Sequence, residues 1–93
     1  MKLRAIEPRD AEAILGIQAE SPEVAEWSRH SYERLTQENM TGWVAEVDGR
    51  ILGFIVVRQV AGDGEILNLA VSPKDRRRGV GTALLIQTEA WAK

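Results

Sequence analysis

The sequence predicts an α+β (mixed α/β) fold with the element order β-α-α-β-β-β-α, because its hydrophobic periodicity changes twice. Apolar residues recur at helical spacing in the first part of the chain, alternate with period two between Gly42 and Val71, and return to helical spacing from Val80. No repeat, linker or low-complexity segment divides the 93 residues, so residues 1–93 are expected to form one domain. Successive antiparallel strands beside helices are typical of this fold class.

The N-terminal part is expected to hold one short strand and two helices. Residues 3–6 alternate apolar and polar or small side chains, as in a strand. Residues 8–10 begin a helix that Ser21-Pro22 ends. Ser28 is expected to cap a second helix that continues to about residue 38.

Three strands are expected to follow. Residues 42–47 alternate with period two, and Asp48-Gly49 predicts a two-residue hairpin because both residue types accept positive φ. The apolar run 50–60 then forms the returning strand. A turn at residues 61–64 precedes a third strand over residues 65–71.

The last element is expected to be an amphipathic helix over residues 80–92. Trp91 and Trp43 are expected in the core, whereas Trp27 and Tyr32 either pack in the core or line a groove, and the single histidine, His30, is expected at the surface. The apolar face of this helix would comprise Val80, Ala83, Leu84, Gln87 and Trp91, widened by Leu85 and Ile86.

Composition excludes several classes of protein. A net charge of −2 argues against a general binder of nucleic acid or anionic membranes, which needs a basic excess. The absence of cysteine excludes disulfides, thiolate catalysis and sulfur metal ligands, and no carboxylate–histidine cluster predicts a metal site. No signal peptide or membrane-spanning run is recognisable, so a cytoplasmic protein is expected.

The segment "SPKDRRRGVGTALL" predicts a phosphate-binding loop. Arg76, Arg77 and Arg78 stand beside Gly79 and Gly81 at the start of the last helix. The first-turn N–H groups of a helix lack partners and carry the positive end of its dipole, and glycine lets a phosphate approach the backbone. A solvated basic turn, with glycine chosen for packing, is the alternative. A P-loop is excluded because it needs a lysine after its last glycine.

The longer stretch "EILNLAVSPKDRRRGVGTALL" resembles the GNAT superfamily of N-acetyltransferases, whose motif Q/R-x-x-G-x-G/A follows a strand. The stretches "PRDAEAIL" and "WVAEVDGRILGFIVVR", with Trp27-Ser28, resemble the branch that acetylates ribosomal-protein alanine. The resemblance covers essentially the whole chain. It implies the N-terminal two-thirds of an acyl-CoA N-acyltransferase fold.

The resemblance also implies acetyl-CoA as the cosubstrate. Its pyrophosphate would bind the backbone amides of residues 76–81, and its pantetheine arm would pair with residues 69–71 like an added strand, beside a bulge that frees N–H groups. The amide of Leu69 would be the oxyanion donor, a contribution of about 2.7–4 kcal/mol. The implied cofactor-binding residues are Leu69, Ala70, Val71, Arg76, Arg77, Arg78, Gly79, Val80, Gly81 and Thr82.

The acceptor is expected to be an amine, with a protein N-terminus favoured by the branch resemblance. The neutral amine would attack the thioester directly, and Glu65 is the candidate general base, acting directly or through water. The alternative for Glu65 is an exposed glutamate at a strand end, with the base drawn from a later strand, as the resemblance to the ribosomal branch implies. The alternative function is a non-catalytic coenzyme A-binding module, or a subunit completed by a partner.

In the family the domain continues beyond this point with a further strand, a helix and a hairpin. The missing strand would form the other wall of the cleft, and the missing helix usually supplies a tyrosine that protonates the thiolate. We therefore expect residues 1–93 to be an incomplete N-acetyltransferase domain. C-terminal truncation is the favoured account, and the alternatives are a portion excised from a longer protein and a subunit that a partner completes. The strand over residues 65–71 would then be an open sheet edge, through which self-association is expected.

Overall fold

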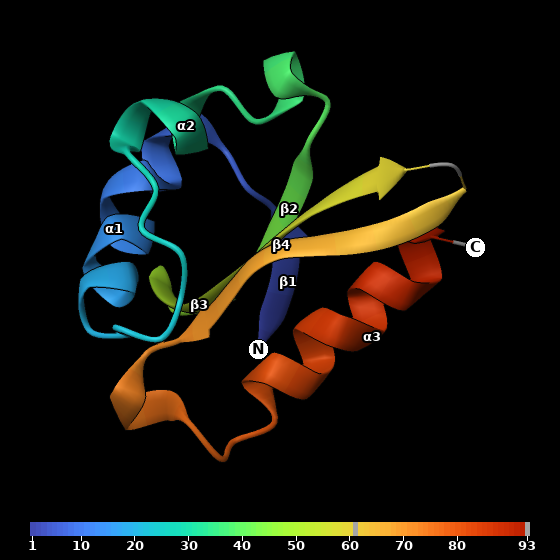
Figure 1. Cartoon of the computed structure of the whole chain (residues 1–93). Helices are drawn as coiled ribbons and strands as arrows, with labels where there is room; N and C mark the ends of the chain where they lie inside the picture. The colour runs from blue at the N-terminus through green and yellow to red at the C-terminus, as the bar shows by residue number, and fades with distance from the viewer. Residues whose placement is uncertain (61, 93) are drawn as a thin grey trace.

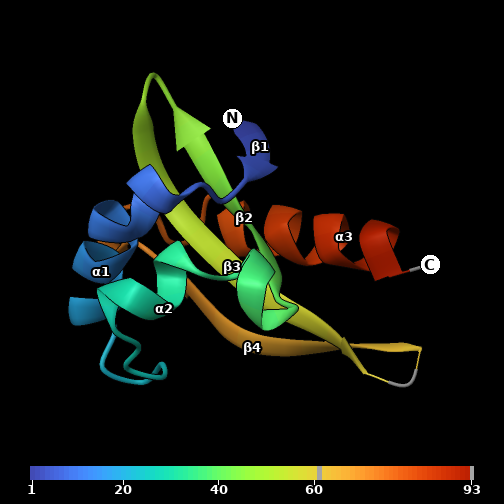
Figure 2. The same ribbon diagram turned by 90° about the horizontal axis from the view of Figure 1, so that it is seen from above.

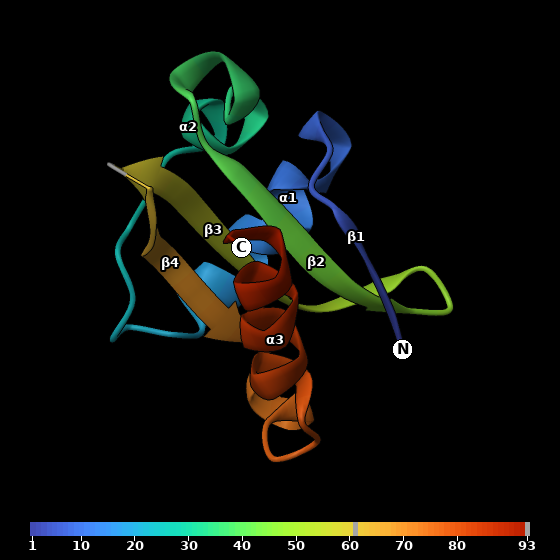
Figure 3. The same cartoon turned by 90° about the vertical axis from the view of Figure 1, so that its right-hand side faces the viewer.

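The computed structural model describes residues 1–60 and 62–92 and confirms the predicted order of helices and strands. One antiparallel sheet has the strand order β1-β2-β3-β4. Helices α1 and α2 cover one face of the sheet, and α3 crosses the other face (Figures 1 and 3). The bounds are β1 (Lys2–Ala5), α1 (Ala11–Ala19), α2 (Arg29–Glu33), β2 (Thr41–Val47), β3 (Arg50–Val60), β4 (Asp63–Val71) and α3 (Val80–Ala92).

The second predicted helix is shorter than expected. The predicted cap is confirmed, since Ser28 Oγ accepts a hydrogen bond from Ser31 N at 3.2 Å. However, Arg34 leaves the helical region with φ −116° and ψ 21°, and only a separate 3-10 turn, Thr36–Glu38, follows. The stretch is rich in residues of modest helix propensity, so it does not sustain a longer helix.

The third strand of the meander begins earlier than expected. Asp63 and Gly64 already pair with β3, opposite Val60 and Gln59, so the predicted turn at residues 61–64 is too long. Gly62 supplies the positive φ of +87° that the tighter turn needs. Residue 61 of that turn lies outside the described residues.

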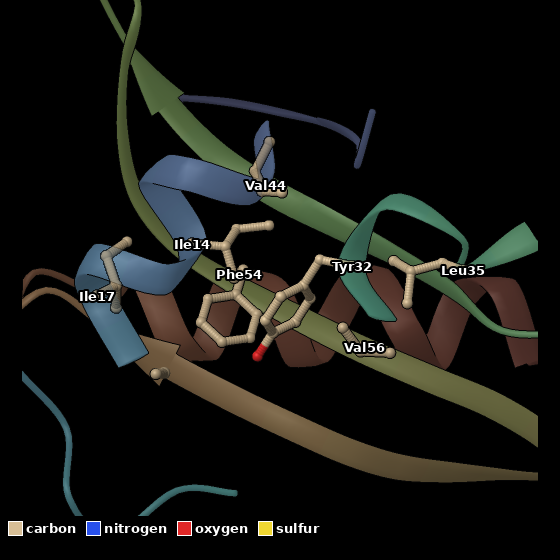
Figure 4. Close-up of a cluster of buried hydrophobic side chains, with 9 residues drawn as sticks. Ile14, Ile17, Tyr32, Leu35, Val44, Phe54 and Val56 are labelled. Carbon is tan, nitrogen blue, oxygen red and sulfur yellow. The ribbon is translucent and has the colours of Figure 1, made fainter. Parts of the chain in front are cut away.

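The alternation of the strands divides the core between the two faces of the sheet. On the face of α1 and α2, seven side chains interlock in Figure 4: Ile14, Ile17, Tyr32, Leu35, Val44, Phe54 and Val56. On the other face, Val80 and Leu84 of α3 pack against Trp43, Ala45, Leu52, Ile55 and Val57. Figure 2 shows the sheet from above, with the helices on its two sides. The predicted period-two strands are thereby confirmed.

Helix α3 buries a narrower stripe than expected. Val80, Leu84 and Thr88 are buried at four-residue spacing, and Thr88 Oγ1 donates to the carbonyl of Leu84 at 3.0 Å. Ile86 was predicted to widen the apolar face, but it is 60 % exposed. Trp91 packs edge-to-face on Trp43, with ring centroids 5.7 Å apart, as predicted for the core. Of the helices in the described residues, none combines the length and apolar character needed to cross a bilayer.

A buried ion pair joins β1 to the start of α1. Arg4 donates to both carboxylate oxygens of Asp10, at 2.8 and 2.9 Å, and also pairs with Glu46 at 3.3 Å. Burial alone would raise the pKa of Asp10, but hydrogen bonds from Arg4 and from the backbone N–H of Glu7 lower it below its usual value. The pair therefore stabilises the fold while Asp10 is ionised.

Replacing Asp10 with asparagine is expected to lower the free energy of unfolding by about 3 kcal/mol near neutral pH, because Arg4 loses its buried partner. The wild-type chain should lose the same stability in acid, as the pH falls below the unfolded pKa of about 3.9 and through the lower folded pKa. Urea unfolding over this pH range checks both effects. Glu7→Gln, at an exposed pair with Arg4, should cost less than about 1 kcal/mol. Parallel pH profiles for wild type and Asp10→Asn would contradict the assignment.

Candidate functional site

One side of β4 presents unpaired backbone groups. Among the described residues β4 pairs only with β3. The hydrogen bond from Ser72 N to Leu52 O, at 2.8 Å, shows that Ser72 and Leu52 form a hydrogen-bonded pair. Because hydrogen-bonded and non-hydrogen-bonded pairs alternate, Leu69 and Val71 turn their N–H and C=O groups outward. The N–H and C=O of Ala70 turn toward β3. An added strand would thus pair with Leu69 and Val71 rather than with Ala70.

The strand is bulged just before these groups. Val56 faces Asn68, whereas Val57 faces Ile66, so Leu67 is an extra residue in β4. A bulge bends its strand and increases the local twist, and bulges are frequent beside active sites. The family resemblance implies a bulge in this strand, and the structure has one at Leu67, two residues ahead of Leu69.

The arginine–glycine segment folds into a hollow of about 260 Å³, here called the loop hollow. The first hydrogen bond of α3 runs from Ala83 N to Gly79 O at 2.9 Å, so the N–H groups of the preceding turn have no partner within the helix. These N–H groups and the helix dipole favour an anion. The lining residues are Val71, Asp75, Arg76, Arg77, Gly79, Val80, Gly81 and Thr82.

The two glycines of this loop have different tasks. Gly79 has φ +78°, which L side chains rarely adopt, so it is needed for the backbone turn. A Cβ at Gly81 would meet only Val71 Cγ2 at 3.7 Å, an ordinary contact, so glycine at this position keeps the hollow open. Arg77 has φ +69° despite its side chain, a strain of about 1–3 kcal/mol of the kind found at ligand sites.

The three arginines, which the sequence suggested as one cluster of charge, separate in the structure. Arg76 donates through Nε to Val71 O at 3.1 Å and through Nη2 to Ser21 Oγ at 3.1 Å, and it pairs with Glu23 at 3.3 Å. Its guanidinium thus fastens the loop to the segment after α1. Arg77 makes no ion pair with any described residue. The long pair of Arg78 with Asp75, 3.9 Å, leaves its side chain 68 % exposed.

Asp75 is a residue of the loop hollow that the sequence did not reveal. Its carboxylate is buried and accepts hydrogen bonds from Arg50, at 2.8 and 3.2 Å. Hydrogen bonding to Arg50 holds the pKa of Asp75 below its usual value and raises that of Arg50. The pair anchors the loop to the start of β3. No local pattern could have indicated it, because the partners are 25 residues apart.

If the loop hollow holds the coenzyme A that the family resemblance implies, its binding is expected to depend on salt through Arg77 and Arg78, and not through Arg76. Arg77→Ala and Arg78→Ala should each flatten the dependence of Kd on ionic strength, because their exposed charges act on the ligand through solvent. Arg76→Ala should leave the slope unchanged and lower thermal stability, because its charge is already paired with Glu23. Titration calorimetry at several salt concentrations checks this. If Kd depended equally on ionic strength in the wild type and in Arg77→Ala/Arg78→Ala, neither side chain would contribute to the site.

A larger hollow of about 580 Å³, here called the α2 hollow, lies at the bulge of β4. Trp27 forms one wall and stacks on Tyr32, with ring centroids 5.6 Å apart and planes at 28°. Tyr32 itself is buried in the core, so of the two aromatic candidates only Trp27 lines a hollow, whereas His30 is exposed as expected. The lining residues are Glu26, Trp27, Ser28, Ser31, Glu38, Met40, Arg58 and Leu67.

Glu65 lies at the beginning of β4, outside this lining. Its carboxylate is half exposed and lies 3.4 Å from Arg58, the residue directly opposite on β3. Four residues of strand separate it from Leu69, about 13 Å at 3.3 Å per residue. The Glu65 carboxylate therefore does not reach the Leu69 amide, and any proton transfer between these points needs water.

The sequence matches the acetyltransferase (GNAT) family over residues 9–93. An uncharacterized N-acetyltransferase of Methanocaldococcus jannaschii is 49 % identical over 49 residues, which are 53 % of this chain and 31 % of that protein. The chain thus matches less than a third of the length of this relative.

The fold is similar to that of the ribosomal-protein-alanine N-acetyltransferase from Brucella melitensis biovar Abortus 2308, with TM-score 0.78, 20 % identity, and coverage of 99 % of this chain and 72 % of that one. It is also similar to the diaminobutyrate acetyltransferase of Paenibacillus lautus in complex with diaminobutyric acid and coenzyme A, with TM-score 0.81, 22 % identity, and coverage of 94 % and 55 %. Because the family match takes in the loop hollow, the bulged strand and the helices on both faces of the sheet, the chain belongs to the acetyltransferase (GNAT) family.

Proposed function

We propose that the chain binds acetyl-CoA along β4 and transfers its acetyl group to an amine. One observation carries this proposal: the two hollows lie on either side of residues 68–70 of β4, one lined by Leu67 and the other by Val71. Between them the N–H and C=O groups of Leu69 face outward, as a strand-like arm requires. A ligand with an anionic head and an extended amide-bearing arm fits this arrangement.

The residues present suit coenzyme A. Its pyrophosphate would take the free N–H groups of Val80, Gly81 and Thr82, with charge supplied by Arg77 in the lining and by the exposed Arg78, which is next in the chain and outside the lining. Its arm would pair with the outward groups of Leu69 and Val71, although the carbonyl of Val71 already accepts from Arg76. When bound, acetyl-CoA supplies an acetyl group activated as a thioester.

The transfer needs no covalent intermediate with the protein. The neutral amine attacks the thioester carbon, the new C–N bond forms, the C–S bond breaks, and coenzyme A leaves as the thiol after taking up a proton. The N–H of Leu69 would stabilise the negative charge that develops on the carbonyl oxygen, with a contribution of about 2.7–4 kcal/mol. The amine must lose a proton, and water would carry it to Glu65.

The acceptor is proposed to be a protein N-terminal amine. The family branch that the sequence resembles supports this, and the Brucella protein, whose fold is similar, is named as acting on ribosomal-protein alanine. The α2 hollow has room for more than the amine itself, and Glu26 and Glu38 bring negative charge that attracts a protonated amine. The similar diaminobutyrate enzyme favours a small free amine as the second candidate.

Titration calorimetry with acetyl-CoA, paired with a thiol-release assay, tests the proposal. The probe acceptors are a short peptide with an N-terminal alanine, its N-acetylated form as a control, and diaminobutyric acid. Binding with thiol release only for the free amines is the expected result. Binding without release would support a non-catalytic coenzyme A-binding module instead. Absence of binding would overturn both functions.

Replacing Glu65 with glutamine tests its role in proton transfer. Because water must bridge the distance, kcat is expected to fall by less than the hundredfold typical of a directly positioned base. The KM for acetyl-CoA should not change. Asp63→Asn, which removes another exposed carboxylate of β4 outside the lining of both hollows, is the matched control and should leave kcat unchanged. An unchanged kcat in Glu65→Gln would leave Glu65 as an exposed glutamate at a strand end.

A further inference from the structure

A buried polar network lies beneath the α2 hollow. Gln18 of α1, Tyr32 of α2 and Asn68 of β4 are 8 %, 1 % and 5 % exposed. Asn68 Nδ2 donates to Tyr32 Oη at 3.0 Å, and Tyr32 Oη donates in turn to Gln18 Oε1. Figure 4 shows the Tyr32 hydroxyl on the side of its ring nearer to β4. Three elements are therefore linked through side chains in the core.

This network also holds the segment between α1 and α2. Gln18 Nε2 donates to Trp27 O at 2.9 Å, and Gln18 Oε1 accepts from Trp27 N at 3.1 Å. Asn68 Nδ2 donates to Ala25 O at 3.0 Å. The backbone that carries Trp27 has few other anchors, because no helix or strand includes residues 20–28. The wall of the α2 hollow is thus placed by two buried amide side chains.

Asn68 occupies a particular position on β4. It is the residue between the bulged Leu67, which lines the α2 hollow, and Leu69, whose N–H faces outward. Its own backbone pairs with Val56 of β3, so its side chain projects from a fixed point of the sheet. Through its hydrogen bond to Ala25 O, two residues before Trp27, the Asn68 side chain ties the segment that carries the Trp27 wall to the strand that carries the Leu69 amide.

The hydrogen bonds of this network permit only one arrangement of donors and acceptors. Burial raises the pKa of Tyr32 to about 12, so its hydroxyl stays protonated at neutral pH. It then donates to Gln18 and accepts from Asn68 at the same time. Removing the Asn68 amide would leave the carbonyl of Ala25 and the hydroxyl of Tyr32 without this donor, and unmet buried groups drive local rearrangement.

We propose that Asn68 is a positioning residue for acetyl transfer. It fixes the position of the Trp27 wall of the α2 hollow relative to the outward amide of Leu69. The inference rests on the proposed function, since it assumes that the acceptor enters the α2 hollow. Asn68 is buried and lines neither hollow. It acts on the geometry between the acceptor and the acyl group, and not on the loop hollow, where Arg50 and Asp75 hold the backbone.

The test is the Asn68→Ala variant, measured in three ways. The KM for a short peptide with an N-terminal alanine is expected to rise about tenfold and kcat to fall, while the Kd for coenzyme A stays within twofold. Amide hydrogen exchange at Trp27 should accelerate at least tenfold, with unchanged rates in β2. Tyr32→Phe keeps the ring stack and the Asn68–Ala25 bond, so it should give the same pattern with smaller changes.

Thr88→Val is the matched control, because it removes a buried side-chain hydrogen bond in α3, outside both hollows. It should lower the stability of the chain and change the KM for the peptide and the Kd for coenzyme A by similar factors. The inference is overturned if Asn68→Ala and Tyr32→Phe change acceptor KM and coenzyme A affinity in parallel, as Thr88→Val does, or if Trp27 exchange is unaltered. A wild-type chain that binds coenzyme A but acetylates no amine would instead refute the proposed function, and this inference with it.

Discussion

Replacing Gly81 with valine is expected to weaken coenzyme A binding more than a hundredfold while the chain stays folded. The protein has room for the new Cβ, which would meet only Val71 Cγ2 at 3.7 Å. The valine side chain would, however, leave no room for the ligand. It would occupy part of a hollow of about 260 Å³, over the N–H groups proposed to hold the pyrophosphate. Calorimetric titration of both proteins with coenzyme A measures the effect, and circular dichroism checks the fold.

Two controls separate blocked binding from lost structure. Pantetheine lacks the pyrophosphate, so its affinity should change little in Gly81→Val. Gly79→Ala instead forces a side chain into φ +78°, at about 1–2 kcal/mol, and should lower stability together with binding. If Gly81→Val weakened pantetheine and coenzyme A equally, the pyrophosphate would not lie over Gly81.

Features encoded by neighbouring residues could be predicted from the sequence. The period-two pattern placed β2 and β3, the Asp48-Gly49 pair placed their hairpin, and Ser28 was recognised as a cap. The arginine–glycine segment was expected to meet the start of α3, and its residues do line one hollow. In each case the signal lies within a few residues of the feature that it predicts.

What the sequence missed depends on contacts between distant segments. Arg50 reaches Asp75, and Arg76 turns away from its two neighbours to Ser21, because the fold brings these segments together. Periodicity reports which face a residue occupies, but not its hydrogen-bond partner. The α2 hollow was missed for the same reason, since its lining comes from four separate stretches of chain.

The open edge of β4 is expected to make the chain self-associate at micromolar concentration, and coenzyme A is expected to reverse this. No described residue pairs with the outward N–H and C=O groups of Leu69, and Ile66 beside them is 48 % exposed. A second copy could add its β4 to the same edge. If the arm of coenzyme A occupies that edge, ligand and partner compete, and mass action shifts the chain to monomer.

Sedimentation velocity with and without excess coenzyme A measures this competition. Ile66→Lys places a charge at the edge and should give monomer without ligand. Ile86→Lys is the matched control: Ile86 is 60 % exposed on α3, so its replacement should leave association unchanged. A wild-type chain that sediments as a compact monomer at every concentration would show that the edge attracts no second chain. Association that persists at saturating coenzyme A would place the contact elsewhere, because a ligand bound along β4 leaves no edge for another strand to join.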